Sequence, residues 1–226
     1  MRARSWLVSI FVFVLSACSH PTGFRPARTL EAGQLEHGVG LQAATMVVTG
    51  GTDALLFDFD EAEGTSRSRP FTPTYAIRYG LTDSLEIGGQ AGATFARAEA
   101  TFQLLETHFL DLAIGGDLGL GAPPVRPRSD EERGAPNLYP SLGVPLLVGL
   151  RPLPWLSLVG HSGPAYWGWI WAVQTGGGVD FNAIPGISIR PHVSFLFALE
   201  DEIVQAGGSG RPHHVFGLDV AFGGRR

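Results

Sequence analysis

The sequence predicts an all-β protein: an up-and-down antiparallel transmembrane β-barrel of about ten strands, with eight as the alternative count. Three observations support this fold class. Apolar and polar residues alternate along many segments, as strands with one apolar and one polar face require. The connections between these segments are long and short in a regular order. After residue 18 no apolar run is long enough for a transmembrane helix, because the best candidate, residues 142–150, is interrupted by two glycines and a proline.

The chain begins with an export signal. Arg2 and Arg4 precede an apolar run over residues 6–15, which is too short to span a bilayer as a helix of about 20 residues would. Residues 15–18, Leu-Ser-Ala-Cys, resemble the lipobox of bacterial lipoproteins, in which the cysteine is acylated and becomes the mature N-terminus. The resemblance implies a signal peptide over residues 1–17, a lipid on Cys18 and an outer-membrane location. The alternative is an incidental cysteine beside an ordinary cleavage site.

Composition excludes several classes of protein. Of 226 residues, 16 are basic, all of them Arg, and 21 are acidic; removal of residues 1–17, which hold two Arg and no acid, leaves 209 residues with a net charge of −7. This charge argues against nucleic acid as a partner. A single cysteine excludes a disulfide within the chain. The sequence predicts no cofactor, and it leaves the oligomeric state open.

The mature chain divides into a lipidated tether and a barrel. Residues 18–33 contain two prolines and two glycines and predict the tether, and residues 34–226 predict the barrel. The ten predicted strands cover residues 35–48, 71–79, 85–95, 99–105, 109–120, 138–150, 155–162, 169–181, 187–199 and 213–222.

The order of the connections predicts how the barrel sits in a membrane. The long connections, residues 49–70, 121–137 and 200–212, all fall on one side of the sheet if the strands run up and down in order. Transmembrane barrels of the outer membrane have short periplasmic turns and longer outer loops. An even strand count returns both chain ends to the periplasmic side, where a lipid on Cys18 would insert in the inner leaflet.

The predicted hairpin over residues 75–95 carries alternation on both strands. Its register is predicted to place Tyr79 opposite Leu85, which sets Arg78 opposite Glu86. The segment 79–88 also resembles the tight periplasmic turns of small outer-membrane barrels. By the same parity Phe95 is predicted to face outward near the loop side of the barrel.

Four strands carry outward-facing sets without a charge, and aromatic residues gather near strand ends, as in the interfacial girdles of membrane barrels. The alternative is a lipid-tethered soluble barrel that buries these apolar residues in its interior and binds an apolar ligand. The outward-facing sets are Leu110, Leu112, Ile114, Leu118 and Leu120; Leu142, Val144, Leu146, Val148 and Leu150; Val193, Phe195, Phe197 and Leu199; and Phe216, Leu218, Val220 and Phe222.

The last strand resembles the C-terminal strand that the barrel-assembly machinery recognises. Gly217, Val220 and Phe222 match the glycine and the two spaced hydrophobic residues of that signal. Val215 departs from the polar residue usual before the glycine, and residues 223–226 extend past the usual terminal aromatic residue. This resemblance implies the barrel-assembly machinery as a partner, and the lipobox implies the lipoprotein-processing machinery; outer-membrane lipids are the third predicted partner.

The residues that alternate with the outward-facing sets include many charged and polar side chains, which predicts a polar lumen. A barrel of about ten strands has an interior that side chains nearly fill, so a plugged or narrowly hydrated lumen is expected, with a solute path as the alternative. Arg78 is predicted to pair with Glu86, and Arg190 with Asp180 or Asp219. The predicted luminal cluster is Arg78, Glu86, Asp180, Arg190, His192 and Asp219.

One pair of residues could support catalysis. His192 and Ser194 share a strand face, with Glu200 or Asp219 as the orienting acid, and they resemble the His-x-Ser element of outer-membrane lipid A deacylases. Phe195 stands where that family has Asn. Residues 58–63 are acidic but lack the glycine of a calcium loop, so no metal site is predicted. The expected function is a non-enzymatic envelope role, structural or solute-related, with a lipid-modifying enzyme as the alternative.

Overall fold

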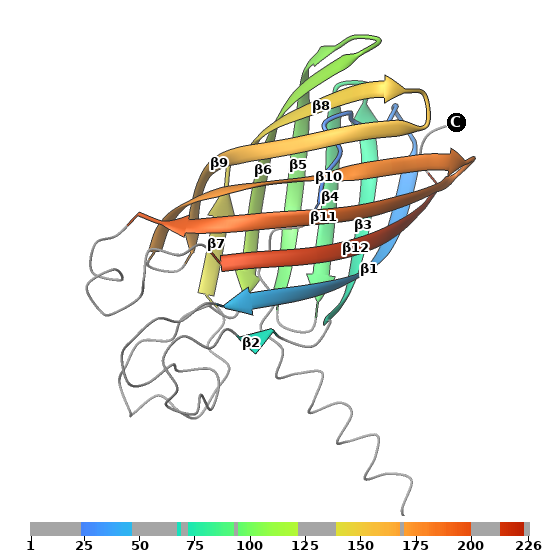
Figure 1. Ribbon diagram of the computed structural model, residues 1–226. Coiled ribbons are helices and arrows are strands. Elements are labelled where there is room, and N and C mark those ends of the chain that lie inside the picture. Colours follow the sequence, from blue (N-terminus) through green and yellow to red (C-terminus); the bar gives the residue numbers. More distant parts are fainter. Residues whose placement is uncertain are drawn as a thin grey trace, which may run out of the picture.

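The protein is a closed antiparallel β-barrel in a computed structural model, which describes residues 24–46, 67–68, 72–92, 95–121, 139–167, 170–199 and 213–223 (Figure 1). No helix in these residues is long and apolar enough to cross a membrane. The strands are β1 (Leu35–Met46), β2 (Arg67–Ser68), β3 (Thr72–Thr82), β4 (Leu85–Gly92), β5 (Phe95–Glu106), β6 (Leu110–Gly121), β7 (Tyr139–Gly143), β8 (Leu146–Leu153), β9 (Leu156–Trp167), β10 (Ile170–Ile184), β11 (Ile187–Ala198) and β12 (His213–Gly223).

The barrel wall has ten strand positions. Apart from β2 and the break between β7 and β8, each strand pairs with the next one along the chain, and β12 pairs with β1, with Val220 opposite Val39, which closes the sheet. β7 and β8 together occupy one position, because both pair with β6 on one side and β9 on the other. The two-residue β2 pairs only with the end of β1. The predicted fold class, an all-β up-and-down barrel of ten strands, is confirmed.

The predicted strand 138–150 is interrupted where β7 ends and β8 begins. Pro145 has no N–H and cannot donate to a neighbouring strand. The neighbouring strands still bond across the gap: Gly115 N donates to Pro145 O at 2.7 Å, and Val144 N donates to Pro164 O at 3.0 Å. The interruption is therefore a local break in a continuous wall.

The two ends of the barrel differ in their connections. At one end, here called the turn end, short turns join β3 to β4, β5 to β6, β8 to β9 and β10 to β11, and β1 begins beside the end of β12. At the other, the loop end, the long connections of residues 47–71, 122–138 and 199–212 leave the strands. The turn end lies at the upper right of Figure 1.

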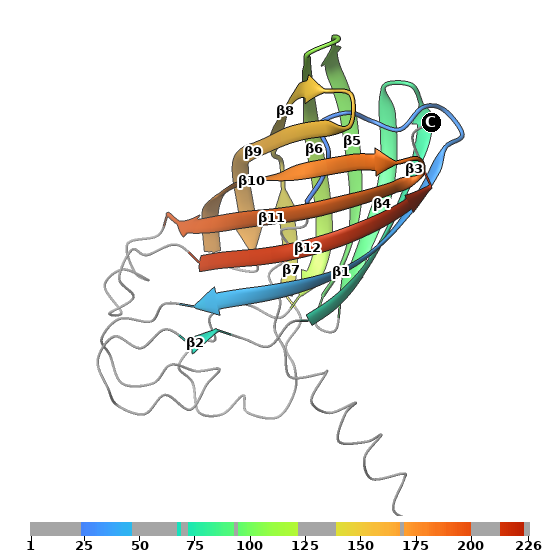
Figure 2. The ribbon, with the colours of Figure 1, turned by 45° about the vertical axis from the view of Figure 1, so that its right-hand side comes forward.

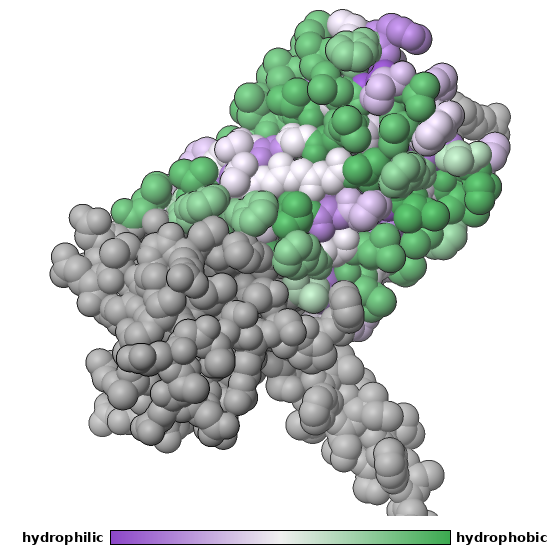
Figure 3. All heavy atoms as spheres, viewed as in Figure 1, coloured by the Kyte–Doolittle hydropathy of each residue, from purple (hydrophilic) through white to green (hydrophobic). Residues whose placement is uncertain are grey.

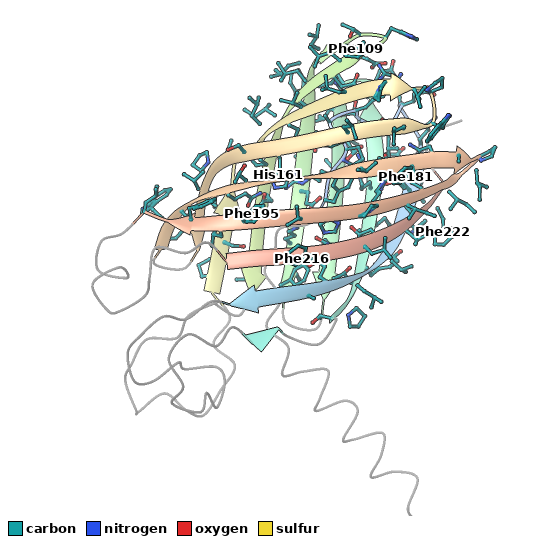
Figure 4. The ribbon with its side chains drawn as sticks, in the orientation of Figure 1. Phe109, His161, Phe181, Phe195, Phe216 and Phe222 are labelled. Atoms are coloured by element: carbon teal, nitrogen blue, oxygen red, sulfur yellow. The ribbon has the colours of Figure 1, made fainter. Side chains whose placement is uncertain are left out.

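The outer face of the wall is apolar. On β6, Ala113 and Asp117 are buried while Ile114 and Leu118 are 41% and 63% exposed. Apolar residues cover most of the described face in Figure 3, and Phe216 and Phe222 on β12 belong to it (Figure 4). This arrangement is the reverse of the one that the soluble-barrel alternative requires, because the polar parity faces inward.

The register of the first hairpin differs from the prediction. Tyr79 lies opposite Ile87, and Arg78 lies opposite Gly88, two residues away from the predicted partners. The turn is shorter than expected, since β3 continues to Thr82 and the register shifts between Gly80 and Thr82. The Thr82 hydroxyl accepts hydrogen bonds from Ser84 N and Leu85 N, which fixes the tight turn.

Phe95 also differs from the prediction. It begins β5 and is 4% exposed, with its side chain in the barrel interior. The prediction of an outward position was wrong because the strands change direction between Gly92 and Phe95, whereas the sequence pattern placed the turn at residues 96–98.

Candidate functional site: the barrel lumen

The most informative feature of the lumen is a part of the chain that precedes the barrel. Residues 24–33, here called the N-terminal segment, run inside the barrel to its turn end and then enter β1 (Figure 2). Phe24, Ala27 and Leu30 are 8%, 1% and 0% exposed. The composition of residues 18–33 predicted a lipidated tether, and this location was not foreseen. Phe24, Arg25, Ala27 and Leu30 are buried by the inward faces of the strands.

Arg25 holds the middle of the N-terminal segment to the wall. Its guanidinium donates to Asp117 Oδ2 at 2.7 Å, and its Nε lies 3.3 Å from Glu99 Oε2. It also donates to the backbone carbonyls of Ala100 and Gly116, on β5 and β6. Arg25 is 4% exposed. A buried guanidinium with two carboxylates and two carbonyls is well compensated for the loss of water.

The segment is also fixed at the turn end. Thr29 N donates to Gln103 Oε1 at 2.8 Å, and Leu30 N donates to Glu86 Oε2 at 2.9 Å. Gly33 N and Gly80 O lie 2.8 Å apart, so the segment joins the edge of β3 as it leaves the lumen. These are bonds from backbone N–H groups, which must find acceptors once they are buried.

Gly80 is required by this close approach. A Cβ atom at this position would lie 2.1 Å from the carbonyl oxygen of Glu31. The backbone of the N-terminal segment therefore occupies the space that any side chain at position 80 would need.

An apolar cluster surrounds the inner end of the segment. Phe24 and Ala27 pack with three wall residues, Ala113, Leu147 and Val159. The Phe24 ring also stacks on the His192 ring, with centroids 5.7 Å apart. The segment is thus held by apolar burial as well as by polar contacts.

An ion-pair network fills the lumen beside the segment and is centred on Glu36. Its carboxylate accepts from Arg78 Nη1 at 2.9 Å and from Arg190 Nη1 and Nη2 at 2.7 Å. Arg78 also donates to both oxygens of Glu86 at 2.6 Å, and Arg190 Nε donates to Asp180 Oδ1 at 3.2 Å. These five side chains are at most 6% exposed.

The structure brings four of the six predicted luminal residues into this network. Arg78 contacts Glu86 diagonally despite the shifted register, and Arg190 contacts Asp180 and not Asp219. Asp219 lies 3.5 Å from His192 Nδ1 instead.

Sequence reasoning missed four charged residues of the lumen: Arg25, Glu36, Arg97 and Glu99. Glu36 lies in a predicted strand and shares the inward parity of that strand, so parity alone could have found it. Arg97 was assigned to a turn, and Arg25 to the tether. Each assignment left one Arg out of the predicted lumen.

The lumen has two halves with different walls. The turn-side half contains the N-terminal segment and the network around Glu36. In the loop-side half, buried polar atoms of Gln42, Gln90 and Ser141 have no hydrogen-bond partner in the part of the chain that the structure describes. A cavity of about 30 Å³ borders Phe24, Gly40 and Gln90, which is room for one or two water molecules.

The predicted catalytic pair does not form a catalytic arrangement. The hydroxyl of Ser194 lies 3.5 Å from Nε2 of His161, on β9, while Nδ1 of His192 lies 3.2 Å from the carbonyl oxygen of Arg190. Ser194 is 1% exposed and faces the lumen. His161 is labelled on β9 in Figure 4. Glu200, one proposed orienting acid, lies outside the described residues.

The remaining predicted residues lie in the last strand of the wall or beyond the described part. Gly217, Val220 and Phe222 belong to β12, where Phe222 is 46% exposed at the turn end. Cys18 and the acidic residues 58–63 lie outside the described residues. Within the described ranges, no group of three or more His, Cys, Asp or Glu side chains could hold a metal ion.

Comparisons with known proteins support the fold. No protein-family model matches this chain, and no curated protein matches it. An outer membrane channel from Pseudomonas putida F1 has a TM-score of 0.53 at 10% identity, with 89% of this chain and 99% of that chain covered. Ail, the attachment invasion locus protein of Yersinia pestis, has a TM-score of 0.38 at 13% identity, with 85% and 99% covered. The outer membrane protease OmpT from Escherichia coli has a TM-score of 0.42 at 8% identity, with 86% and 97% covered. The chain has the fold of outer-membrane β-barrels.

Proposed function

We propose that this chain is a non-enzymatic lipoprotein of the Gram-negative outer membrane whose barrel lumen is closed by its own N-terminal segment. Its envelope role is then structural, exercised by the membrane-embedded barrel and the loops it carries, and not by free diffusion of solutes. The observation that carries this proposal is the burial of most of residues 24–30 among paired charges inside the barrel.

The wall supports residence in a membrane. Large apolar side chains are exposed on every strand of the barrel wall, whereas most charged residues of these strands are buried in the lumen in ion pairs. In water such an apolar surface would drive aggregation, whereas in a membrane it contacts the hydrocarbon chains of the lipids. Outer-membrane lipids and the barrel-assembly machinery are therefore the partners we propose, together with the lipoprotein-processing machinery that would modify Cys18.

The lumen argues against the enzyme alternative. A lipid-modifying enzyme must bring its nucleophile to an ester at the membrane surface, and Ser194 is buried inside the barrel beside His161. An acid would have to orient that imidazole, yet no contact between His161 and a carboxylate occurs among the described residues.

The closed lumen can be tested by conductance in planar bilayers. We expect the wild-type protein to give no stable open pore. The Arg25→Ala change leaves Asp117 and Glu99 without their shared partner and should loosen the N-terminal segment, so that open events become frequent.

Arg28→Ala is the matched control, because the Arg28–Glu106 pair is about one-third exposed and lies at the turn end. This variant should stay closed. A steady pore in the wild-type protein would overturn the closed-lumen proposal and favour the solute path. Heat-modifiable gel mobility confirms that each variant is folded before its conductance is interpreted.

The lipoprotein assignment has its own test. Cys18→Ser should abolish incorporation of radiolabelled palmitate, because the thiol is the acyl acceptor in the resembled lipoproteins. The variant should remain in the membrane fraction, since the strands hold it there independently. Recovery of the variant as a soluble periplasmic protein would contradict the transmembrane assignment.

A further inference from the structure

Asp219 differs from the other carboxylates of the described lumen. Each of the others contacts at least one guanidinium group: Glu36, Glu86, Glu99, Asp111, Asp117 and Asp180. Asp219 forms no ion pair with an Arg in the described part of the chain, and its Oδ2 lies 3.5 Å from Nδ1 of His192. The same nitrogen lies 3.2 Å from the carbonyl oxygen of Arg190, a contact that a neutral imidazole can make. A buried carboxylate in this position needs another source of positive charge.

The Asp219 carboxylate lies over a glycine and beside a hydroxyl. Asp219 on β12 is opposite Gly40 on β1, and Gly40 is opposite Thr74 on β3, so the three residues form one row across the wall. A Cβ atom at Gly40 would lie 1.7 Å from Asp219 Oδ1 and 2.8 Å from Thr74 Oγ1. The absence of a side chain at position 40 therefore lets the carboxylate and the hydroxyl oxygens approach each other inside the barrel.

A third oxygen belongs to the same place. Gln90 on β4 lines the cavity of about 30 Å³ together with Thr74, Gly40 and Asp219. Gln90 is 6% exposed, and its Oε1 accepts no hydrogen bond in the residues that the structure describes. A buried carbonyl oxygen without a partner costs free energy unless something binds it. The cavity thus offers a carboxylate, a hydroxyl and an amide carbonyl, which are the ligands that hard cations prefer.

Size and charge restrict which cation fits. The guanidinium groups of Arg78, Arg97 and Arg190 also border the cavity, and each is paired with a carboxylate. They repel a doubly charged ion more strongly than a singly charged one. Ca²⁺ takes about six to eight oxygen ligands, and Mg²⁺ usually keeps several waters, whereas the cavity has room for only one or two water molecules. A small, singly charged ion is the occupant that this space allows.

We infer that the cavity beside Gly40 is a Na⁺ site, in which Asp219 Oδ1, Thr74 Oγ1 and Gln90 Oε1 bind the ion and water completes its coordination. The ion supplies the positive charge that no Arg in the described lumen gives to Asp219. It joins β12 to β3 and β4 across the seam where the last strand closes on the first (Figure 2). Because the site has a single acidic ligand, it is not one of the groups of three acidic, His or Cys side chains considered above.

The test is denaturant titration of the full-length protein in lipid vesicles, with equal concentrations of NaCl in one series and choline chloride in the other. Choline carries the same charge but is too large for the cavity. The titration is run at about pH 8, above the range in which histidine normally gains a proton. We expect Na⁺ to lower the unfolding equilibrium constant about tenfold relative to choline, as for a site that is about nine-tenths occupied.

Equal stability in the two salts would overturn the Na⁺ site. Asp219 would then be neutralised by a proton, on its own carboxyl group or on His192, because neither protonation requires Na⁺.

Three variants locate the effect. Asp219→Asn keeps the shape of the side chain but removes its charge, so it should abolish the difference between the salts and be at least as stable as the wild-type protein in choline. Thr74→Val removes one oxygen ligand and should weaken the Na⁺ effect, which keeps the test independent of the Asp219 variant. Glu106→Gln is the matched control, because this carboxylate belongs to the exposed pair with Arg28 and should leave the tenfold effect intact.

The variants also define what would refute the ligands. A full Na⁺ effect that survives Asp219→Asn or Thr74→Val would overturn the proposed site. A Na⁺ effect lost in Glu106→Gln would show general screening of surface charge and would overturn it as well. Heat-modifiable gel mobility confirms that each variant is folded before its titration is interpreted.

Discussion

The turn-side and loop-side halves of the lumen are lined by the same inward parity of the same strands, but they are closed by different means. The turn-side half packs the N-terminal segment against buried ion pairs, in which Glu36 bridges two guanidinium groups. The loop-side half is lined by amides, hydroxyls, glycines and an apolar cluster of Ala165, Ala172 and Leu196, and several of its polar atoms lack partners in the described residues. The difference indicates that the seal of the barrel lies at the turn side.

Buried charges make the packing of the turn-side half more constrained than that of the loop-side half. A buried carboxylate or guanidinium is tolerated only when it is paired and hydrogen-bonded, so each charge fixes the position of another. An uncharged amide without a partner costs much less, about 1–3 kcal/mol. The turn-side half should therefore be sensitive to single substitutions, and the loop-side half tolerant.

Glu36→Gln should have the largest effect. It removes the carboxylate that Arg78 and Arg190 share, and leaves two buried cations with a neutral amide. We expect the free energy of unfolding to fall by about 3–5 kcal/mol, measured by denaturant titration of the protein folded in lipid vesicles. Glu106→Gln, at the exposed pair with Arg28, should cost less than about 1 kcal/mol. Similar losses in both variants would mean that water screens the Glu36 network.

Gly80→Ala should have an intermediate effect. A methyl group here would overlap the carbonyl oxygen of Glu31, so the N-terminal segment must shift away from the edge of β3. We expect a loss of about 1–3 kcal/mol in the same titration, with more frequent opening in conductance measurements.

Gly116→Ala is the control for the glycine change, because a Cβ atom at position 116 meets nothing within 4 Å. It should leave both stability and conductance near the wild-type values. A Gly80→Ala variant as stable and as closed as Gly116→Ala would show that the N-terminal segment is not seated against β3 in the membrane.

The wall could be predicted from the sequence because its signal is local. Alternation with a period of two defines which side chains share a face, so Ile114 and Leu118 were correctly expected on the outside. The turn positions were less well defined. A shift of two residues in the first hairpin preserves parity, so the pattern could not distinguish Ile87 from Leu85 as the partner of Tyr79.

The position of the N-terminal segment inside the barrel could not be predicted, because the segment has no periodic pattern of apolar and polar residues. Residues 24–33 form no strand or helix, and two prolines and two glycines over residues 18–33 are equally typical of a flexible tether. Only the charges gave a hint: the predicted lumen held more acids than Arg, and Arg25 supplies a missing cation to Asp117. Long-range pairing of this kind depends on the closed barrel and is not visible in a sequence window.

Gln42→Leu should have the smallest effect and tests the loop-side half directly. Gln42 is 1% exposed, and neither its Oε1 nor its Nε2 has a partner in the described residues. Replacing an unpartnered buried amide by an apolar side chain of similar size removes a desolvation cost, so we expect a change within about 1 kcal/mol, or a small gain, in the free energy of unfolding. Glu86→Gln serves as the turn-side comparison, since Glu86 accepts from Arg78 and from Leu30 N. A loss above about 2 kcal/mol for Gln42→Leu would mean that this amide is bonded in the membrane and that the loop-side half is packed as tightly as the turn-side half.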